Sequence, residues 1–133
     1  MTTLPSTHVA VQVGAPAAEV YAFAADPTNL PRWAAGLADA HVELRDGHWI
    51  AVGALGEVEV AFVSRNEFGV LDHDVTLPDG EVVTNPVRVL PNDDGCDVVF
   101  TVRQRPGMSA EDLAGDVARV RADLETLARL LEG

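Results

Sequence analysis

The sequence has no lysine and one cysteine, and none of its apolar runs approaches the ~20 residues that a membrane-spanning helix needs. The single cysteine, Cys96, excludes an internal disulfide and a cluster of thiolate metal ligands. The N-terminus also lacks a basic segment followed by an apolar one, the pattern of a secretory signal. We therefore expect a cytoplasmic protein without membrane insertion.

Positive charge is scarce throughout the chain. Nine arginines stand against 21 acidic residues, which gives a formal net charge of −12. This charge repels the phosphates of nucleic acids and the surfaces of anionic membranes, so we expect neither to be a partner. Of the 133 residues, 47% are hydrophobic, which suits one globular domain over residues 1–133 with a core of its own.

The sequence also lacks the short motifs that mark common catalytic and cofactor sites. It contains no HExxH pair, no GxGxxG turn, no P-loop and no GxSxG elbow. The glycine-rich stretch GALGEVEV, residues 53–60, is expected to form a hairpin turn because no helix follows it. We expect no metal site and no cofactor.

A strong helical pattern fills the C-terminal end of the chain, from Ser109 to Glu132. Six apolar residues recur there at spacings of four, three, four, three and four: Leu113, Val117, Val120, Leu124, Leu127 and Leu131. They form one apolar stripe, which is typical of a helix laid along a hydrophobic surface. Ser109 is a suitable N-cap, and the helix would be roughly 35 Å long.

The rest of the chain reads as two helices inserted among strands. His8–Val13 alternates as a half-buried strand. Residues 17–25 form a helix after it, and a second short helix carries Leu30, Trp33 and Leu37. Residues 39–104 then alternate with period two between regularly spaced turns, which predicts an antiparallel meander. The predicted order is β-αα-ββββββ-α, with about seven strands.

Two tight turns set the register of the first strands of the meander. A type I′ turn at Asp46-Gly47 pairs Leu44 with Trp49. A second turn at Ala54-Leu55 then places Val60 beside Trp49 and leaves the intervening glutamates on the outer face. The agreement between hydrophobic pattern and register supports both.

The later strands follow from a loop over residues 78–80, where proline and glycine favour a turn. This loop pairs His73 with Asn85. Asn85 belongs to the strand after the loop, which is expected to continue through residue 89. In the last strand, the favoured parity places Val98, Phe100 and Val102 inward and Arg103 outside. A five-residue loop over residues 91–95 would reverse this parity and bring Arg103 in. We expect the C-terminal helix to lie on the sheet face that these strands build: Trp49, Val58, Val60, His73, Val75, Val83, Asn85 and Phe100.

The segment HVAVQVGAPAAEVYAFAADPTNLPRW, residues 8–33, resembles the opening of the START/Bet v1-like superfamily, often called SRPBCC or polyketide cyclase/dehydrase-like proteins. In that family a strand leads into a helix with a Val-x-x-Phe core, an Asp-Pro pair and a short helix with a tryptophan. The matching residues are Val20, Phe23, Asp26, Pro27 and Trp33. The resemblance covers nearly the whole chain, although its motifs belong to the fold and not to catalysis.

This resemblance implies an α+β helix-grip (Bet v1-like) fold. In such a fold a curved antiparallel sheet wraps the long C-terminal helix, and a cavity between them takes a lipid, a polyketide or another apolar molecule. Functions across the family range from binding and transport to cyclisation and dehydration, so the fold does not fix the activity.

His73 is the most informative titratable residue of the predicted inner face, where it stands opposite Asn85 among leucines and valines. The pair could orient a hydroxyl or carbonyl group of a ligand. Alternatively, His73 could act as general acid or base, because its ordinary pKa of about 6.5 suits work near neutral pH. A third interpretation is a buried histidine satisfied by Asn85 and a backbone carbonyl. The predicted inner face offers no second acid or base, which ranks catalysis below binding.

Ten residues are predicted to contact a ligand between the sheet and the helix: Trp33, Trp49, Val60, Phe62, His73, Asn85, Phe100, Leu113, Val117 and Val120. At the other end of the helix, Leu124, Leu127 and Leu131 are expected to anchor it. The two tryptophan rings either line a pocket or fill a core, and the sequence leaves both possibilities open.

Three functions fit these features. The preferred one is binding of a small hydrophobic or amphipathic molecule in the cavity between the sheet and the C-terminal helix. The second is a polyketide cyclase/dehydratase-like enzyme that uses His73 as acid or base. The third is a domain with a filled core that acts through its surface, for example as a homodimer.

Overall fold

The computed structural model describes residues 2–54 and 56–132 of the chain. Within these residues eight strands, three α-helices and two 3₁₀ helices follow one another: β1 (Ser6–Val13), α1 (Ala17–Ala24), η1 (Pro27–Asn29), α2 (Leu30–Trp33), η2 (Ala35–Leu37), β2 (His41–Arg45), β3 (His48–Gly53), β4 (Gly56–Phe62), β5 (His73–Thr76), β6 (Val82–Asn85), β7 (Val87–Asn92), β8 (Gly95–Arg103) and α3 (Ala110–Glu132). No helix of the described part has both the length and the apolar composition needed to cross a membrane.

The strands form two antiparallel sheets, with orders β1-β8-β7 and β2-β3-β4-β5-β6, where the sequence predicted one sheet of about seven strands. The difference arises at Pro86, where the expected strand that runs through residue 89 divides into β6 and β7. Proline has no N–H to donate to a neighbouring strand. The Pro86 carbonyl still accepts the Thr101 N–H, at 2.9 Å, so β8 stays attached at the break.

The residues just before β5 tie the two sheets together. The Leu71 N–H donates to the Val87 carbonyl at 2.8 Å. The Asp72 carboxylate accepts the Val87 N–H at 2.9 Å and two hydrogen bonds from the Arg88 guanidinium, at 3.2 and 2.8 Å. These bonds from Arg88 hold the pKa of Asp72 below its ordinary value, although partial burial acts the other way.

The strand registers confirm three predicted residue pairs: Leu44 with Trp49, Trp49 with Val60, and His73 with Asn85. Asp46 and Gly47 have φ angles of 51° and 82°, as a type I′ turn requires. Leu55, in the second predicted turn, lies outside the described residues. Val98 and Val102 are buried and Arg103 is exposed at the end of β8, which agrees with the favoured of the two parities.

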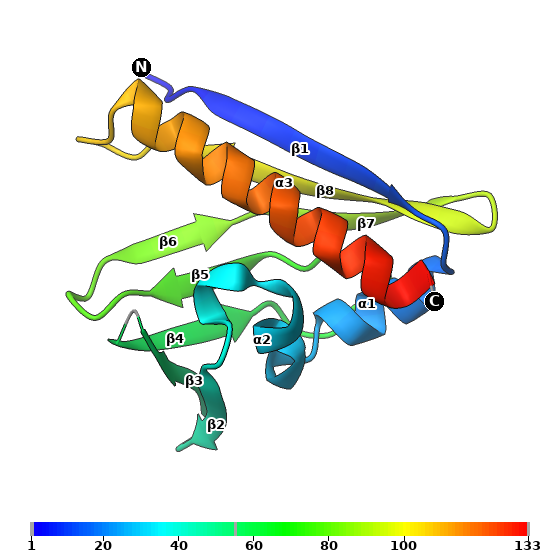
Figure 1. The fold of residues 1–133 in the computed structure, drawn as a ribbon, viewed down its shortest axis with the longest axis horizontal. Coiled ribbons are helices and arrows are strands. Elements are labelled where there is room, and N and C mark those ends of the chain that lie inside the picture. Colours follow the sequence, from blue (N-terminus) through cyan, green and yellow to red (C-terminus); the bar gives the residue numbers. More distant parts are fainter. Residues whose placement is uncertain (1, 55, 133) are drawn as a thin grey trace.

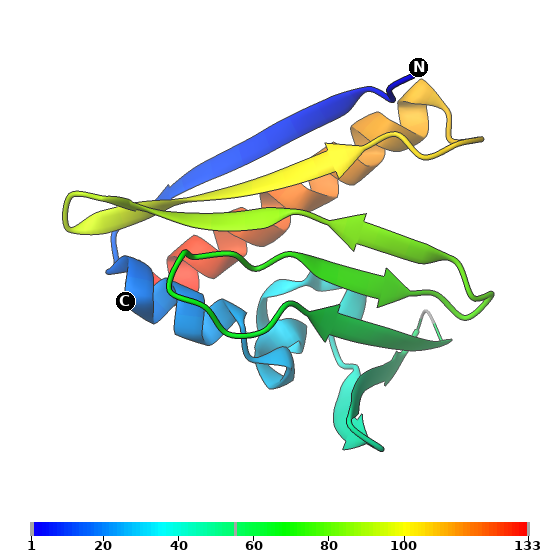
Figure 2. The same cartoon turned by 180° about the vertical axis from the view of Figure 1, so that it is seen from behind.

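The helix α3 begins in a capping box, in which the Asp112 N–H donates to Ser109 Oγ at 3.0 Å and the Ser109 N–H donates to the Asp112 carboxylate at 3.3 Å. It then runs diagonally across the molecule, and its last turns lie close to α1 (Figure 1). Its most extensive contacts are with β1 and β8. Seen from behind, the strands cover one side of the helix (Figure 2). The helix therefore rests on the three-stranded sheet and not mainly on the five-stranded one.

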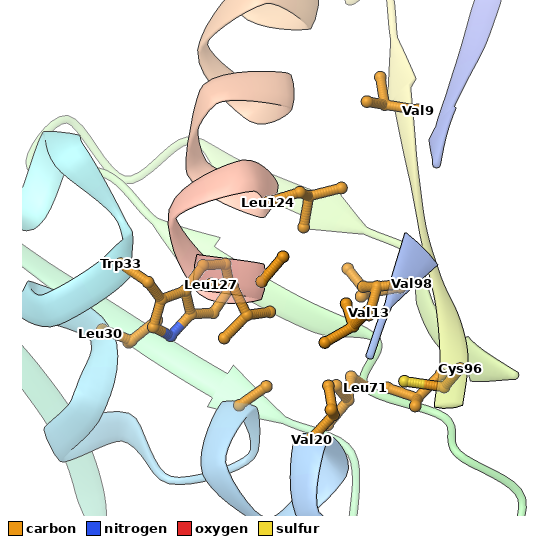
Figure 3. Close-up of a cluster of buried hydrophobic side chains, with 14 of the residues drawn as sticks. Val9, Val13, Val20, Leu30, Trp33, Leu71, Cys96, Val98, Leu124 and Leu127 are labelled. Atoms are coloured by element: carbon orange, nitrogen blue, oxygen red, sulfur yellow. The ribbon is translucent and has the colours of Figure 1, made fainter. Parts of the chain in front are cut away.

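The buried core gathers around the C-terminal half of α3. Leu124 and Leu127 are both 0% exposed. Val13 and Val98 from the three-stranded sheet and Val20 from α1 point into the same cluster (Figure 3). This half of the helix is anchored in solid packing, as the sequence predicted for these two leucines.

Candidate functional site

Two adjoining cavities lie between α3 and the sheets. The inner one, here called the chamber, has a volume of about 140 Å³. The outer one, here called the rim groove, has a volume of about 470 Å³ and is open to solvent. Five residues line both of them: Ala34, Leu37, Phe100, Val120 and Asp123. The two cavities therefore adjoin one another along these residues.

The chamber occupies the space that the separation of the two sheets leaves beside α3. The five-stranded sheet contributes Val60, His73 and Val75 to its wall, and α3 contributes Val120 and Leu124. Because α3 rests on β1 and β8, the five-stranded sheet faces the helix across this space instead of packing tightly on it. The chamber thus lies beside the middle of the helix, at Val120, Asp123 and Leu124.

His73 is held in one orientation by its neighbours. Its Nδ1 lies 3.0 Å from the Leu71 carbonyl oxygen. Since a carbonyl only accepts, Nδ1 carries the hydrogen, and in the neutral ring Nε2 carries the lone pair. The ring is packed against Phe62 at 4.8 Å between ring centres and meets Phe100 edge-on at 6.0 Å. These contacts fix both the tautomer and the direction of Nε2.

The charge of His73 follows from its surroundings. Burial lowers its pKa below the ordinary value of 6.5, and this effect outweighs the Leu71 carbonyl and the carboxylates of Asp72 and Asp74, which raise it. The ring is therefore neutral at pH 7. Both aspartates engage partners on the outer face, Arg88 and Thr84, so neither forms a dyad with the imidazole.

Asn85 completes the polar pair where the chamber meets the rim groove. Its Nδ2 lies 3.4 Å from His73 Nε2, a long contact for a hydrogen bond. Asn85 lines the groove, whereas His73 lines the chamber. Because the bond between them is weak, the imidazole lone pair and the amide can each bind a ligand without losing a strong interaction.

Besides His73, the site contains a second group that can act as acid or base, Asp123. This corrects the expectation that the inner face has no other acid or base. It projects from α3 and lines both cavities. Its carboxylate accepts the Ala35 N–H at 3.1 Å. Burial raises the pKa of Asp123, and this effect exceeds the opposite influence of the Ala35 N–H and of Arg119.

The sequence held a weak signal for Asp123. It lies three residues after Val120 and four before Leu127, so the three share one face of the helix. A carboxylate at the edge of an apolar stripe usually marks the boundary with solvent. Only the cavity shows that this edge of the stripe is enclosed.

Trp33 lines the chamber and is 7% exposed. Its indole Nε1 has no hydrogen-bond partner among the residues that the structure describes. An unpaired buried donor costs roughly 1–3 kcal/mol. The wall of the chamber therefore includes an aromatic ring whose polar atom is unsatisfied.

The structure brings together six of the ten residues predicted to contact a ligand, in the walls of the chamber or the rim groove: Trp33, Val60, His73, Asn85, Phe100 and Val120. Phe62 lies behind His73, at a void of about 10 Å³. The remaining three line neither cavity. Trp49 lies on β3, where the sheet curls away from α3 (Figure 1). Leu113 and Val117 are half-buried against the core nearer the start of the helix.

Comparison with solved structures identifies the architecture. DynU16, a protein of the dynemicin biosynthetic locus, is 18% identical over 96% of this chain, with a TM-score of 0.72, and this chain spans 47% of its length. CalU16 from Micromonospora echinospora is 17% identical, with 96% and 74% of the two chains covered and a TM-score of 0.67. Truncated norcoclaurine synthase from Thalictrum flavum is 14% identical, with 97% and 94% covered and a TM-score of 0.63. At these identities the likeness shows the fold alone.

The family is shown by the sequence itself. No curated protein matches the chain. A family model described as polyketide cyclase / dehydrase and lipid transport, however, matches residues 5–132, from the start of β1 to the end of α3. The structural neighbours share the Bet v1-like helix-grip fold of antiparallel strands and a long C-terminal helix. The chain therefore belongs to the polyketide cyclase / dehydrase and lipid transport family of the SRPBCC (Bet v1-like) superfamily.

Proposed function

We propose that this protein binds a small amphipathic molecule in the chamber and the rim groove, with a polar group of the ligand beside His73 and Asn85. Membership of the family supports a ligand-binding or polyketide-processing role. The observation that carries the proposal is the position of this polar pair at the junction between an apolar chamber and an open groove.

The apolar part of such a ligand would fill the chamber, whose wall is mainly aliphatic and aromatic. A ligand that buries about 200 Å² of apolar surface there gains roughly 5 kcal/mol. Part of this gain is offset by the lost motion of the ligand. With its volume of about 140 Å³ the chamber holds only part of a molecule, whereas the groove, at about 470 Å³, is as large as ordinary ligand sites. The ligand therefore spans both.

The polar part of the ligand is defined by what His73 and Asn85 can bind. The neutral imidazole accepts a hydrogen bond at Nε2, so it pairs with a hydroxyl or another donor. The Asn85 amide donates to a carbonyl and also accepts. A hydroxyl group close to a carbonyl would satisfy both residues and would replace their weak contact at 3.4 Å with two better bonds.

Blocking the chamber tests the proposal directly. Val120 lines both cavities, and a Val120→Trp substitution places a large ring between the chamber and the groove. Titration with the neutral fluorescent probe N-phenyl-1-naphthylamine should show at least a tenfold weaker affinity for this variant than for the wild type.

The matched control is Leu130→Trp, which adds the same ring at a position of α3 that is 39% exposed. It should bind the probe as the wild type does. Equal affinity of the Val120→Trp variant and the wild type would contradict the proposal.

Asp123 favours a second function, acid–base dehydration of a β-hydroxy carbonyl compound. His73 reaches the chamber from β5 and Asp123 reaches it from α3, so a ligand between them has a base on one side and an acid on the other. The pKa shifts have the useful directions, because burial keeps the imidazole neutral and favours the protonated form of Asp123.

In this reaction His73 Nε2 takes the proton from the carbon between the carbonyl and the hydroxyl-bearing carbon. The electron pair of that C–H bond forms the new C=C bond, and the C–O bond breaks. Asp123 protonates the departing hydroxyl, which leaves as water. The imidazolium then returns its proton to the Asp123 carboxylate through solvent, which restores both groups.

His73→Ala and Asp123→Asn variants separate this reaction from simple binding. Turnover is followed by the absorbance of the conjugated product, and affinity is measured with the neutral probe. If the protein is such an enzyme, both variants lose turnover and keep the affinity for the probe within about threefold. Unchanged turnover in either variant would remove that residue from the mechanism. His41→Ala, which changes an exposed histidine, is the control.

A further inference from the structure

We propose that the ligand ends in an anionic group, a carboxylate or a phosphate, which Arg103 binds at the mouth of the rim groove. This inference rests on the proposed function, because it names the chemical class of the ligand that the chamber takes. The ligand is then an amphipathic acid, with its apolar body directed to the chamber and its charge at the rim.

Arginines are concentrated at the rim groove. The chain has nine arginines and a net charge of −12. Three of these arginines line the rim groove, Arg103, Arg105 and Arg119, with Asp116 and Asp123 as the only acidic residues among its lining residues. The groove thus gathers three of the nine arginines of a strongly acidic protein, although Glu81, which pairs with Arg105, offsets the excess of one positive charge among the lining residues.

Two of these three arginines are paired with carboxylates. Arg105 is paired with Glu81, and Arg119 is paired with Asp116. Within residues 2–54 and 56–132, Arg103 has no carboxylate within ion-pair distance. Its guanidinium is a planar fork that binds a carboxylate or a phosphate through two parallel hydrogen bonds. Arg103 is thus the cation of the groove that is available to a ligand.

The geometry of β8 places this charge at a suitable distance from the chamber. Phe100 lines the chamber and the groove, and Arg103 ends the same strand three residues later. At about 3.4 Å per residue, roughly 10 Å separate the two along the strand. A charge inside the chamber would lose its hydration, which is costly, whereas a charge at the rim keeps contact with water. The apolar body therefore lies inward and the acid outward.

Three ligands with the same twelve-carbon chain test the inference: dodecanoate, dodecyl phosphate and neutral dodecanol. Each is titrated against N-phenyl-1-naphthylamine bound to the wild type, to Arg103→Gln and to Arg121→Gln. Arg121 is exposed on α3 and does not line the groove, so its substitution removes the same charge elsewhere on the surface. Thermal unfolding of each variant checks that the fold is retained.

We expect Arg103→Gln to weaken the binding of at least one anionic ligand about tenfold, which corresponds to about 1.4 kcal/mol, and to leave dodecanol within twofold. The anion with the larger loss identifies the group that the site prefers. Arg121→Gln should leave all three ligands within twofold of the wild type.

Other outcomes overturn the inference. If Arg103→Gln changes no anion, or if both variants weaken the anions equally, Arg103 does not bind the acid. The proposed function still stands in those cases as long as dodecanol displaces the probe. If none of the three ligands displaces the probe from the wild type, the proposed function fails together with the inference.

Discussion

The two halves of α3 differ in what they cover, although one apolar stripe runs through both. In the C-terminal half, Leu124 and Leu127 are 0% exposed and form the centre of the core. In the N-terminal half, Leu113, Val117 and Val120 are only half-buried. The C-terminal half is mainly an anchor, although Asp123 and Leu124 also stand in the chamber wall, and the N-terminal half borders the groove through Asp116, Arg119 and Val120.

The cause of this difference lies in the sheets. The helix lies along β1 and β8, whereas the five-stranded sheet has its own strand order and joins the other sheet through a few bonds, such as that of the Leu71 N–H to the Val87 carbonyl. Apolar periodicity shows that a helix face must be covered, and it does not show how completely. The strands opposite the open half are tied to the three-stranded sheet, for example by Asp72 with Arg88, and α3 makes its main contacts with β1 and β8 instead.

The largest expected effect is on stability, from Leu127→Ala. Removal of a fully buried leucine side chain should lower the free energy of unfolding by 2–5 kcal/mol, typical of such substitutions. Val120→Ala, on the half-buried part, should cost about 1 kcal/mol or less but weaken probe binding. Urea unfolding measures both. A similar loss for the two variants would show that the N-terminal half is packed as tightly as the C-terminal half.

A smaller effect is expected where the two sheets are joined. Asp72→Asn should lower the free energy of unfolding by about 1–3 kcal/mol, because the charged hydrogen bonds with Arg88 are lost. Glu125→Gln, at an exposed position of α3, is the control and should stay within about 0.5 kcal/mol of the wild type.

The same carboxylate predicts a dependence on pH. The pKa of Asp72 is lowered in the folded protein, so its stabilising effect is complete above the ordinary pKa of about 3.9 and is lost as the pH falls through the folded value. Acid titrations of the wild type and Asp72→Asn should therefore converge at low pH. Curves that stay parallel would show that Asp72 and Arg88 do not couple the sheets electrostatically.

The smallest effect concerns His73. Its pKa is lowered in the folded state, so the unfolded chain binds a proton more readily once the pH falls below about 6.5. Stability should then decline until the pH reaches the folded pKa. Replacement by a non-titrating ring, His73→Phe, should flatten this part of the curve, whereas His41→Gln at an exposed site should not. An unchanged slope in His73→Phe would contradict an enclosed imidazole.

Much of the fold was predictable from the sequence because its turns specify registers. Asp46-Gly47 set the first hairpin, and the loop over residues 78–80 placed His73 opposite Asn85, as the structure confirms. The split of the sheets was less evident, although Pro86 carried the signal: a proline inside a predicted strand removes a donor and favours a break.

The site was predictable only in part. The polar pair followed from register, since opposite residues in neighbouring strands share a face. Asp123 did not, because the edge of an apolar stripe looks the same whether solvent or a cavity lies beside it. Trp49 shows the converse problem: its inward register was right, but the curl of β2 and β3 takes it away from α3 (Figure 1). Curvature of a sheet depends on packing over many strands and is not contained in local periodicity.

The claim that the N-terminal half of α3 borders a ligand site is tested most directly by methyl NMR with N-phenyl-1-naphthylamine. On saturation, we expect the methyl resonances of Val60, Val75 and Val120 to shift, because these residues line the chamber. The methyl resonances of Val13 and Leu127, in the core, should stay in place. Shifts confined to residues outside the chamber and the groove, or no shifts at a saturating concentration, would contradict the account.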